Sequence, residues 1–509
     1  METKKRIETL IENLSPICEP WIQEKDGKLQ FIDPNDGVEI SAHYGATYMA
    51  AALILYGRLI QDMDRTSIGI KLLQSILDRW NVSKKLPSFH ADFNSFVLCV
   101  IADVLNDENP DVSKKIREVI LETADNRHPT VNWIPMRWQV NRMRYKWTGD
   151  EEYKKRAEMC ARDIELATNA DGGIEDRLPK GISFNLQYDI ATVAVLQYLR
   201  TQGVDYDLSR ELKFLLNTVS PDGDINYQGR GTNQIFAWGL WIYLLSSSCH
   251  KEALEKALDF VEPRVVGMYE KHNIMLNDFA GTDKYLWWDY HYCSVYCAHF
   301  LFWLVMSSYD FDKFPIGYYT REDKSETGLH ICRAENSFVA YFDGRKEYLS
   351  ESGPSICYIW NRVNGVICKG AFGPWQGAFG KKYVYGDALF KNYCGVLSIN
   401  RKKNLIENRY FHRLFPSIKN INSITVQPLF CSLNVNENDG RLEIIWKCDS
   451  NKDVILNIPS FTKKVSFVVY ADGKEVNLQE VGMIRNQYGM AYLFQTGLLR
   501  CNFLKLGIE

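Results

Sequence analysis

Apolar and polar positions follow one pattern up to about residue 310 of this 509-residue chain and a different one after it. Before that point, six segments each open with a loop rich in Asp, Asn, Gly and Pro and continue as an apolar stretch of several helical turns. They cover residues 36–57, 87–105, 128–147, 171–199, 222–245 and 281–305. Charged, amphipathic stretches alternate with them, as at 113–125, 151–168 and 250–265. This pattern predicts helix pairs in which one helix is buried all round and its partner has a solvent face.

The six apolar segments recur at a nearly constant spacing. One polar residue near each predicted helix start marks the period: His43, Asn94, Asn141, Tyr188, Gln234 and His291. Their successive gaps are 51, 47, 47, 46 and 57 residues. Two-helix repeats of this length are typical of stacked αα-hairpins. We therefore expect an (α/α)6 toroid over residues 1–312, with six parallel inner helices whose N-termini gather at one end and favour an anionic ligand.

After residue 312 the pattern changes to short runs of alternating apolar and polar residues rich in β-formers. Turn residues separate the runs, as at Asp343-Gly344, Asn364-Gly365, Asp439-Gly440 and Asp472-Gly473. Alternation with such turns predicts antiparallel strands. The expected fold is therefore a toroid followed by an antiparallel β-sandwich over residues 313–509.

Charge and composition narrow the range of ligands. The chain has 60 basic and 63 acidic residues without a long run of either sign, so we expect no nucleic-acid partner. The 13 Trp, 28 Tyr and 25 Phe are explained either by core packing or by a cleft that stacks sugar rings. Zinc-type spacings, a P-loop and a dinucleotide fingerprint are all missing from the sequence, so we expect neither a metal nor a cofactor.

The sequence also bears on the compartment. The N-terminal residues lack the apolar stretch of a signal peptide, and no stretch is long enough for a membrane span. The 13 Cys residues follow no disulfide framework, which favours a reducing compartment. We expect a cytoplasmic location for the sequence as written, and a periplasmic or secreted one if a leader has been removed.

Two candidate sites lie in the third and fourth repeats. Asn132 beside Trp133 is suited to hold a sugar carboxylate while the indole stacks a sugar, although a helix-capping Asn next to a core Trp has the same pattern. Tyr188 stands at the start of an inner helix, where cationic neighbours would lower its phenol pKa and allow proton transfer; a core tyrosine is the alternative. Glu175, in the loop before it, is a possible carboxylate ligand.

Two further candidates lie in the fifth and sixth repeats. Arg230 lies between two glycines and is followed by Asn233 and Gln234. This pattern is typical of a site that binds a carboxylate. The sixth repeat places His291, a candidate acid or base, among aromatic residues that suit a sugar. Its aromatic neighbours Trp288 and Tyr290, together with the markers His43 and Asn94 of the first two repeats, complete the predicted substrate-binding set.

In the order of its motifs the chain resembles the polysaccharide lyases of the chondroitin AC/hyaluronate lyase and heparinase II/III type. The resemblance rests on Asn132-Trp133, on Asp171-Gly172-Gly173 followed by Tyr188, and on Arg230-Gly231. It implies a toroid and β-domain architecture and cleavage of a uronic-acid-containing polysaccharide by β-elimination. The sequence departs from the family pattern because no His follows the Asp-Gly-Gly loop between Ile174 and Leu178.

The resemblance also implies roles for the candidate residues. Asn132 and Arg230, with Asn233 or Gln234, would neutralise the substrate carboxylate and stabilise the enolate-like transition state. The base would be Tyr188, His291 or another histidine such as His90 or His412. Three alternatives remain: an inverting glycoside hydrolase using carboxylates such as Glu175, Asp176, Asp189 and Asp289, a uronate C5-epimerase, and a non-catalytic carbohydrate-binding protein.

Overall fold

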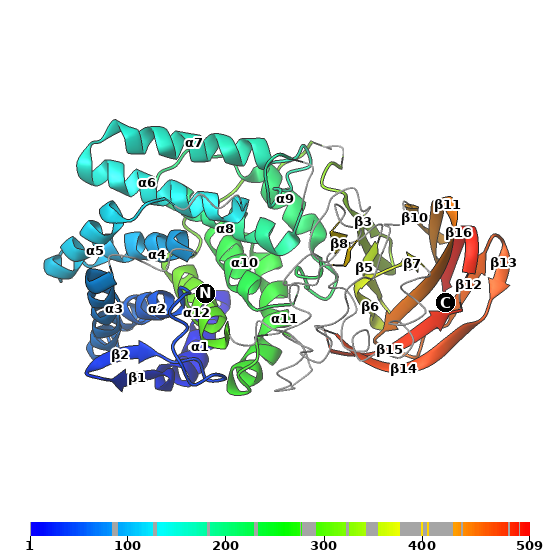
Figure 1. Cartoon of the computed structure of the whole chain (residues 1–509), viewed down its shortest axis with the longest axis horizontal. Coiled ribbons are helices and arrows are strands. Elements are labelled where there is room, and N and C mark those ends of the chain that lie inside the picture. Colours follow the sequence, from blue (N-terminus) through cyan, green and yellow to red (C-terminus); the bar gives the residue numbers. More distant parts are fainter. Residues whose placement is uncertain are drawn as a thin grey trace.

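A computed structural model shows a helical part followed by a part built of strands (Figure 1). It describes residues 2–83, 90–125, 130–180, 184–228, 233–274, 276, 292–321, 325–342, 355–376, 399–400, 405–406, 431–438, 441–486, 489–497 and 499–509. None of the helices within these ranges is both long and apolar enough to cross a membrane.

The helical part consists of twelve α-helices in the described ranges, with two short 3-10 helices and a small hairpin. The α-helices are α1 Glu2–Cys18, α2 Gly45–Leu59, α3 Met63–Ser83, α4 Ala91–Val104, α5 Pro110–Glu122, α6 Ile134–Thr148, α7 Glu151–Ala167, α8 Leu186–Thr201, α9 Ser209–Thr218, α10 Phe236–Ser247, α11 Lys251–Glu270 and α12 Cys293–Tyr309. The remaining elements are η1 Glu19–Trp21, η3 Val131–Trp133, β1 Ile22–Lys25 and β2 Lys28–Phe31.

The even-numbered helices contact one another in a closed cycle. α2 packs on α4, α4 on α6, α6 on α8, α8 on α10, α10 on α12, and α12 returns to α2. The Tyr309 hydroxyl donates to the Leu55 carbonyl at 2.8 Å where the cycle closes. Each odd-numbered helix lies against one member: α3 on α2, α5 on α4, α7 on α6, α9 on α8, α11 on α10 and α1 on α12. The chain therefore forms an inner and an outer set of helices, as Figure 1 shows.

The burial of the two sets matches their sequence patterns. Every residue of α10, from Phe236 to Ser247, is buried, and α12 is buried except at Tyr296 and Tyr309. The outer helix α5 instead buries one stripe, which includes Val112, Ile116 and Ile120 at helical spacing. α10 and α12 are buried all round because they contact other helices on every side, whereas the inner helix α6 carries several polar residues such as Arg137 and Arg142.

The strands of the second part pair antiparallel, as the sequence predicts. They are β3 Leu329–Arg333, β4 Ser337–Phe342, β5 Ser355–Asn361, β6 Gly365–Phe372, β7 Pro374–Gln376, β8 Ile399–Asn400, β9 Leu405–Ile406, β10 Cys431–Asn438, β11 Arg441–Ser460, β12 Phe467–Ala471, β13 Lys474–Val476, β14 Leu478–Asn486, β15 Gly489–Thr496 and β16 Leu499–Ile508. Apart from the β8–β9 pair, these described strands form one sheet of twelve strands.

Strand β11 joins the two halves of this sheet. Its first residues pair with β10 and β16, the register shifts between Lys447 and Lys452, and its last residues pair with β15 and β6. Side chains from β4–β6 on one side and from β11, β12 and β16 on the other bury one common hydrophobic core. The bulge lets one strand serve both halves because it bends the chain locally.

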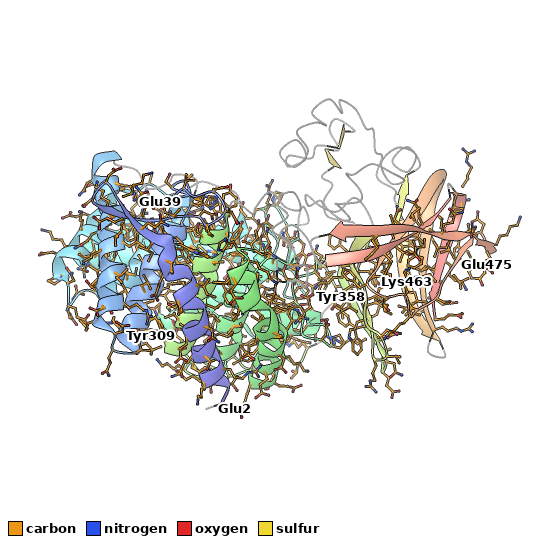
Figure 2. The ribbon with its side chains drawn as sticks, turned by 90° about the horizontal axis from the view of Figure 1, so that it is seen from below. Glu2, Glu39, Tyr309, Tyr358, Lys463 and Glu475 are labelled. Carbon is orange, nitrogen blue, oxygen red and sulfur yellow. The ribbon has the colours of Figure 1, made fainter. Side chains whose placement is uncertain are left out.

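The two parts share buried contacts. Phe338 and Tyr358 of the sheet belong to the same hydrophobic cluster as the inner helices, and their rings lie 6.3 and 5.1 Å from that of Tyr227. Figure 2 places Tyr358 at this junction. The Tyr358 hydroxyl donates to the Asp222 carboxylate at 2.8 Å, and Arg333 donates to the carbonyl of Asn217 at 3.0 Å.

Candidate functional site

Rings from all six inner-helix repeats gather at the end where the inner helices begin. In spatial order they are Trp133, His90, His43, Tyr292, Tyr296, Phe236 and Tyr188. Successive ring centroids lie 5.7, 3.8, 4.2, 6.1, 6.2 and 6.4 Å apart. They belong to the starts of α6, α4, α2, α12, α10 and α8, and we call this set the aromatic arc. The period found in the sequence therefore corresponds to a real convergence of side chains.

Two histidines stack in the middle of the arc. The His43 and His90 rings lie 3.8 Å apart at 33°, directly before α2 and α4. The His90 Nδ1–H donates to the Ala42 carbonyl at 3.1 Å, since a carbonyl can only accept. Burial and the neighbouring His90 lower the pKa of His43 to about 2, so this imidazole is neutral. Its Nδ1 is buried and has no hydrogen-bond partner among the described residues.

Asn132 and Trp133 stand at one end of the arc. Both lie in η3, directly before α6, with 3% and 6% of their surfaces exposed. The Trp133 ring makes edge contact with Phe93 at 5.5 Å. Within the described part of the chain the Asn132 Oδ1 atom lacks a hydrogen-bond partner, although it is buried.

Tyr188 stands at the other end of the arc, half-buried in the first turn of α8. Asn185 caps this helix by accepting from the Gln187 N–H at 3.0 Å. The Gln187 side chain in turn accepts from Asn226 Nδ2 at 3.0 Å. The turn that carries Tyr188 is therefore held by amide side chains, and Asp189 in the same turn accepts from the Ile174 N–H at 3.1 Å.

Asn233 and Gln234 lie in the turn before α10 and are buried. Asn233 adopts a left-handed conformation, with φ 65°, and its N–H donates to the Asn226 carbonyl at 2.8 Å. Asn226 Nδ2 also donates to the Gln234 carbonyl at 3.0 Å. Asn226, which the sequence analysis did not single out, is thus the residue that joins the starts of α8 and α10.

The carboxylates near the arc are engaged in structural contacts. Glu175 accepts from Asn169 Nδ2 at 3.0 Å, and Asp92 forms a buried ion pair with Arg137 at 2.9 Å. Asp189 accepts from the Ile174 N–H at 3.1 Å, and burial raises its pKa well above the usual range. Glu175 and Asp189 thus contact the loop before α8, and neither is seen to contact the rings of the arc.

The other predicted ligands divide into two groups. Asn94 has both ends of its amide engaged, because it accepts from Thr47 at 2.6 Å and donates to the His90 carbonyl at 3.2 Å. It thus joins α2 to α4. Arg230, Trp288, Tyr290 and His291 lie outside the described residues.

Behind the arc, His299 of α12 is fully buried between four aromatic rings. They are those of Tyr44, Tyr48, Phe93 and Phe236, at 5.4, 4.6, 6.2 and 4.7 Å. Burial lowers the pKa of His299 well below its usual value, so its ring is neutral too. The sequence does not predict the His43–His90 stack, because a period along the chain does not tell which helix faces meet.

Comparison with known proteins gives a general likeness. The chain matches no family model, and no curated protein matches it. A solved structure of a polysaccharide lyase is 12% identical, with a TM-score of 0.43, and the match covers 61% of this chain and 98% of that protein. A glycosyl hydrolase of family 88 from Bacteroides vulgatus is 12% identical, with a TM-score of 0.42, over 60% of this chain and 98% of its own.

A third solved structure is the unsaturated glucuronyl hydrolase from Streptococcus agalactiae. It is 15% identical, with a TM-score of 0.37, and the match covers 61% of this chain and 92% of that one. At these identities and TM-scores the similarity assigns neither a family nor an activity to the chain.

Proposed function

We propose that the chain is a carbohydrate-active enzyme that cleaves a uronic-acid-containing polysaccharide or oligosaccharide by β-elimination. In this proposal the cycle of helix pairs is an (α/α)6 toroid, the strands form a β-sandwich, and the aromatic arc is the substrate site. The supporting observation is the chemistry of the arc: flat rings that suit sugar faces, beside an amide oxygen on Asn132 and an imidazole nitrogen on His43 without partners among the described residues.

The residues have the following roles. The substrate carboxylate must be neutralised before the proton on C5 becomes acidic enough to remove, and Asn132 and Arg230 do this. Tyr188 or His291 removes the proton, and one of them protonates the leaving glycosidic oxygen. His43 stays neutral and binds a sugar hydroxyl through its unpaired nitrogen, because its pKa of about 2 keeps it unprotonated at neutral pH.

The engagement of the carboxylates favours a lyase over an inverting hydrolase. A hydrolase of that kind needs two carboxyl groups roughly 6.5–9.5 Å apart on either side of the scissile bond. Glu175 is tied to Asn169 and Asp92 to Arg137. Asp189 accepts from the Ile174 N–H through one oxygen, and its other, buried oxygen has no hydrogen-bond partner among the described residues. Glu175 and Asp92 therefore count against the hydrolase, and Asp189 does not. A β-elimination needs an amide or cation for the carboxylate and a phenol or imidazole for the proton. Asn132, beside the arc, offers an amide, and the arc itself offers phenols and imidazoles.

The test is a screen of sulfated and unsulfated uronate polysaccharides for near-ultraviolet absorbance from an unsaturated product. On the substrate found, we expect Tyr188→Phe to lower kcat by about a hundredfold or more with KM nearly unchanged, because only the hydroxyl is lost. Glu175→Gln serves as the matched control and should retain activity. A fully active Tyr188→Phe beside an inactive Glu175→Gln, with a saturated product, would instead establish the hydrolase.

A further inference from the structure

A buried ion pair connects the sheet to the helical part next to the proposed site. Lys369 of β6 pairs with Asp224, which lies in the loop between α9 and α10. The two side chains are 9% and 0% exposed. The Lys369 ammonium also lies 5.4 Å from the Phe260 ring centre and 5.8 Å from that of Tyr358, within the range of cation–π attraction. A charge buried to this degree is held in one place by its partners.

The Asp224 carboxylate also accepts a hydrogen bond from within its own loop. While one oxygen of Asp224 faces Lys369, the other accepts from the Asn226 N–H at 2.9 Å. The backbone of Asp224 is tied twice to Ser220, through the Ser220 hydroxyl and the Ser220 N–H, each at 2.9 Å. Residues 220–226 are therefore held by hydrogen bonds to Asp224, the residue that pairs with Lys369.

Asn226 forms hydrogen bonds at the starts of two inner helices, α8 and α10. Its Nδ2 group donates to Gln187, the residue before Tyr188, and to the carbonyl of Gln234, just before α10, each at 3.0 Å. Its own carbonyl accepts from the Asn233 N–H at 2.8 Å. An unbroken series of hydrogen bonds thus runs from the sheet to the start of α8.

We infer that Lys369 is a positioning residue for the helical end of the enzyme, acting through Asp224 and Asn226 on the first turn of α8. This inference rests on the proposed function for the identity of Tyr188 as a catalytic residue. Its consequence is that the β part takes part in the site without touching substrate. A displacement of about 1 Å at a catalytic group is enough to reduce the rate by up to a hundredfold.

The experiment compares Lys369→Met with Lys369→Arg, which keeps the charge, and with Arg333→Met as the matched control. Arg333 crosses the same junction, donating to the carbonyls of Asn217 and Val219, and no hydrogen bond joins it to Asn226 within the described residues. Amide hydrogen exchange of the ligand-free proteins is measured at residues 184–190 and 233–238. Values of kcat and KM are measured on the substrate found in the screen.

We expect exchange in these two segments to be about tenfold faster in Lys369→Met, with kcat lowered about tenfold and KM within about twofold. In Lys369→Arg, the exchange rates and kcat should both return most of the way to their values in the natural protein. Arg333→Met should change neither the exchange rates nor kcat. If Lys369→Met does not fold, Lys369→Met combined with Asp224→Asn replaces it, because that pair leaves no unpaired buried charge.

The inference is overturned if exchange is unchanged in both segments, or if exchange is faster but kcat is unaltered. It is also overturned if Lys369→Met and Arg333→Met have equal effects. Failure of the proposed function has a different result. In that case no uronate polymer yields an unsaturated product even with the natural sequence, while the exchange measurement still shows whether Lys369 orders the starts of α8 and α10.

Discussion

At the scale of single residues, the site contains an imidazole, that of His43, that burial keeps neutral. The pKa of His43 is lowered to about 2, whereas an unfolded histidine titrates near 6.5. Below pH 6.5 the unfolded chain therefore binds a proton that the folded protein does not. The contribution of His43 to the free energy of unfolding is therefore fully present above pH 6.5. It is lost progressively as the pH falls from 6.5 toward 2.

We predict that His43→Gln reduces the loss of stability on acidification. Between pH 7 and pH 5 the free energy of unfolding should fall by about 1–2 kcal/mol less in the variant than in the natural protein. Urea titrations at the two pH values measure this difference. His299 is present in both proteins, so its own lowered pKa cancels. Equal losses in the two proteins would show that His43 is protonated when folded.

The sequence predicts some of these residues better than others. His43 and Tyr188 are predicted because each marks the start of a repeat, and Asn132 because it stands beside Trp133; the structure places all three near the N-terminal ends of inner helices. The stack of His43 on His90 could not be predicted, since it depends on the relative rotation of α2 and α4. The directions of the Glu175 and Asp189 side chains could not be predicted either. The local sequence around a carboxylate does not tell whether it faces a ligand or a neighbouring backbone group.

At the scale of elements, two turns one repeat apart have the same construction. Gly172 and Gly223 have φ of 96° and 93°, and a Cβ atom on either would lie 2.5 or 2.7 Å from a carbonyl oxygen, that of Arg210 or that of Lys256. Each glycine thus allows a loop to lie directly against the next outer helix. The Asp171-Gly172 pair, which forms part of the family resemblance in the sequence, has this packing role.

We predict that Gly172→Ala and Gly223→Ala each lower the free energy of unfolding by about 2–4 kcal/mol, through backbone strain and the clash with the carbonyl. Gly203→Ala is the control, because Gly203 has φ 82° and open space around it. It should cost only about 1 kcal/mol. Chemical denaturation of the three variants measures these values, and equal losses in all three would remove the clash as a cause.

Element prediction was best for the inner helices and poorest for the longest strand. A helix such as α10 is recognisable because its first ten positions, Phe236–Leu245, are all apolar, a run too long for a typical strand. β11 was predicted as two separate strands, since the register shift between Lys447 and Lys452 interrupts the alternation. A bulge of this kind depends on the partner strand, and the local sequence does not reveal it.

At the scale of the whole molecule, the boundary between the parts stays a prediction. The sequence places it after residue 312, yet the next residues bind to the helices. The N–H of Phe314 donates to the Ser247 carbonyl at 3.0 Å, and its carbonyl accepts from Gln197 at 2.9 Å. The sheet then covers Tyr227 with Phe338 and Tyr358.

We predict that a chain ending at residue 321 is less stable than the complete chain. It lacks the sheet that buries Tyr227, which is 1% exposed, and it leaves Asp224 buried without Lys369. Thermal unfolding should begin several degrees lower, and limited proteolysis should cut first between residues 217 and 228. An unchanged melting temperature would mean that the helical part is independent of the sheet.

The closed cycle of helices has a consequence for synthesis on the ribosome. α2 has an unbroken buried stretch from Tyr48 to Tyr56, and one of its two cyclic neighbours is α12, whose last residue is Tyr309. About 250 residues must be translated after α2 emerges before that neighbour exists, which takes roughly 12–50 seconds at 5–20 residues per second. Throughout that interval α2 of the nascent chain lacks α12, which packs against it in the folded protein. Translation speed and chaperone binding during this window thus influence the yield of native protein, and a pause placed before α12 lengthens the exposure.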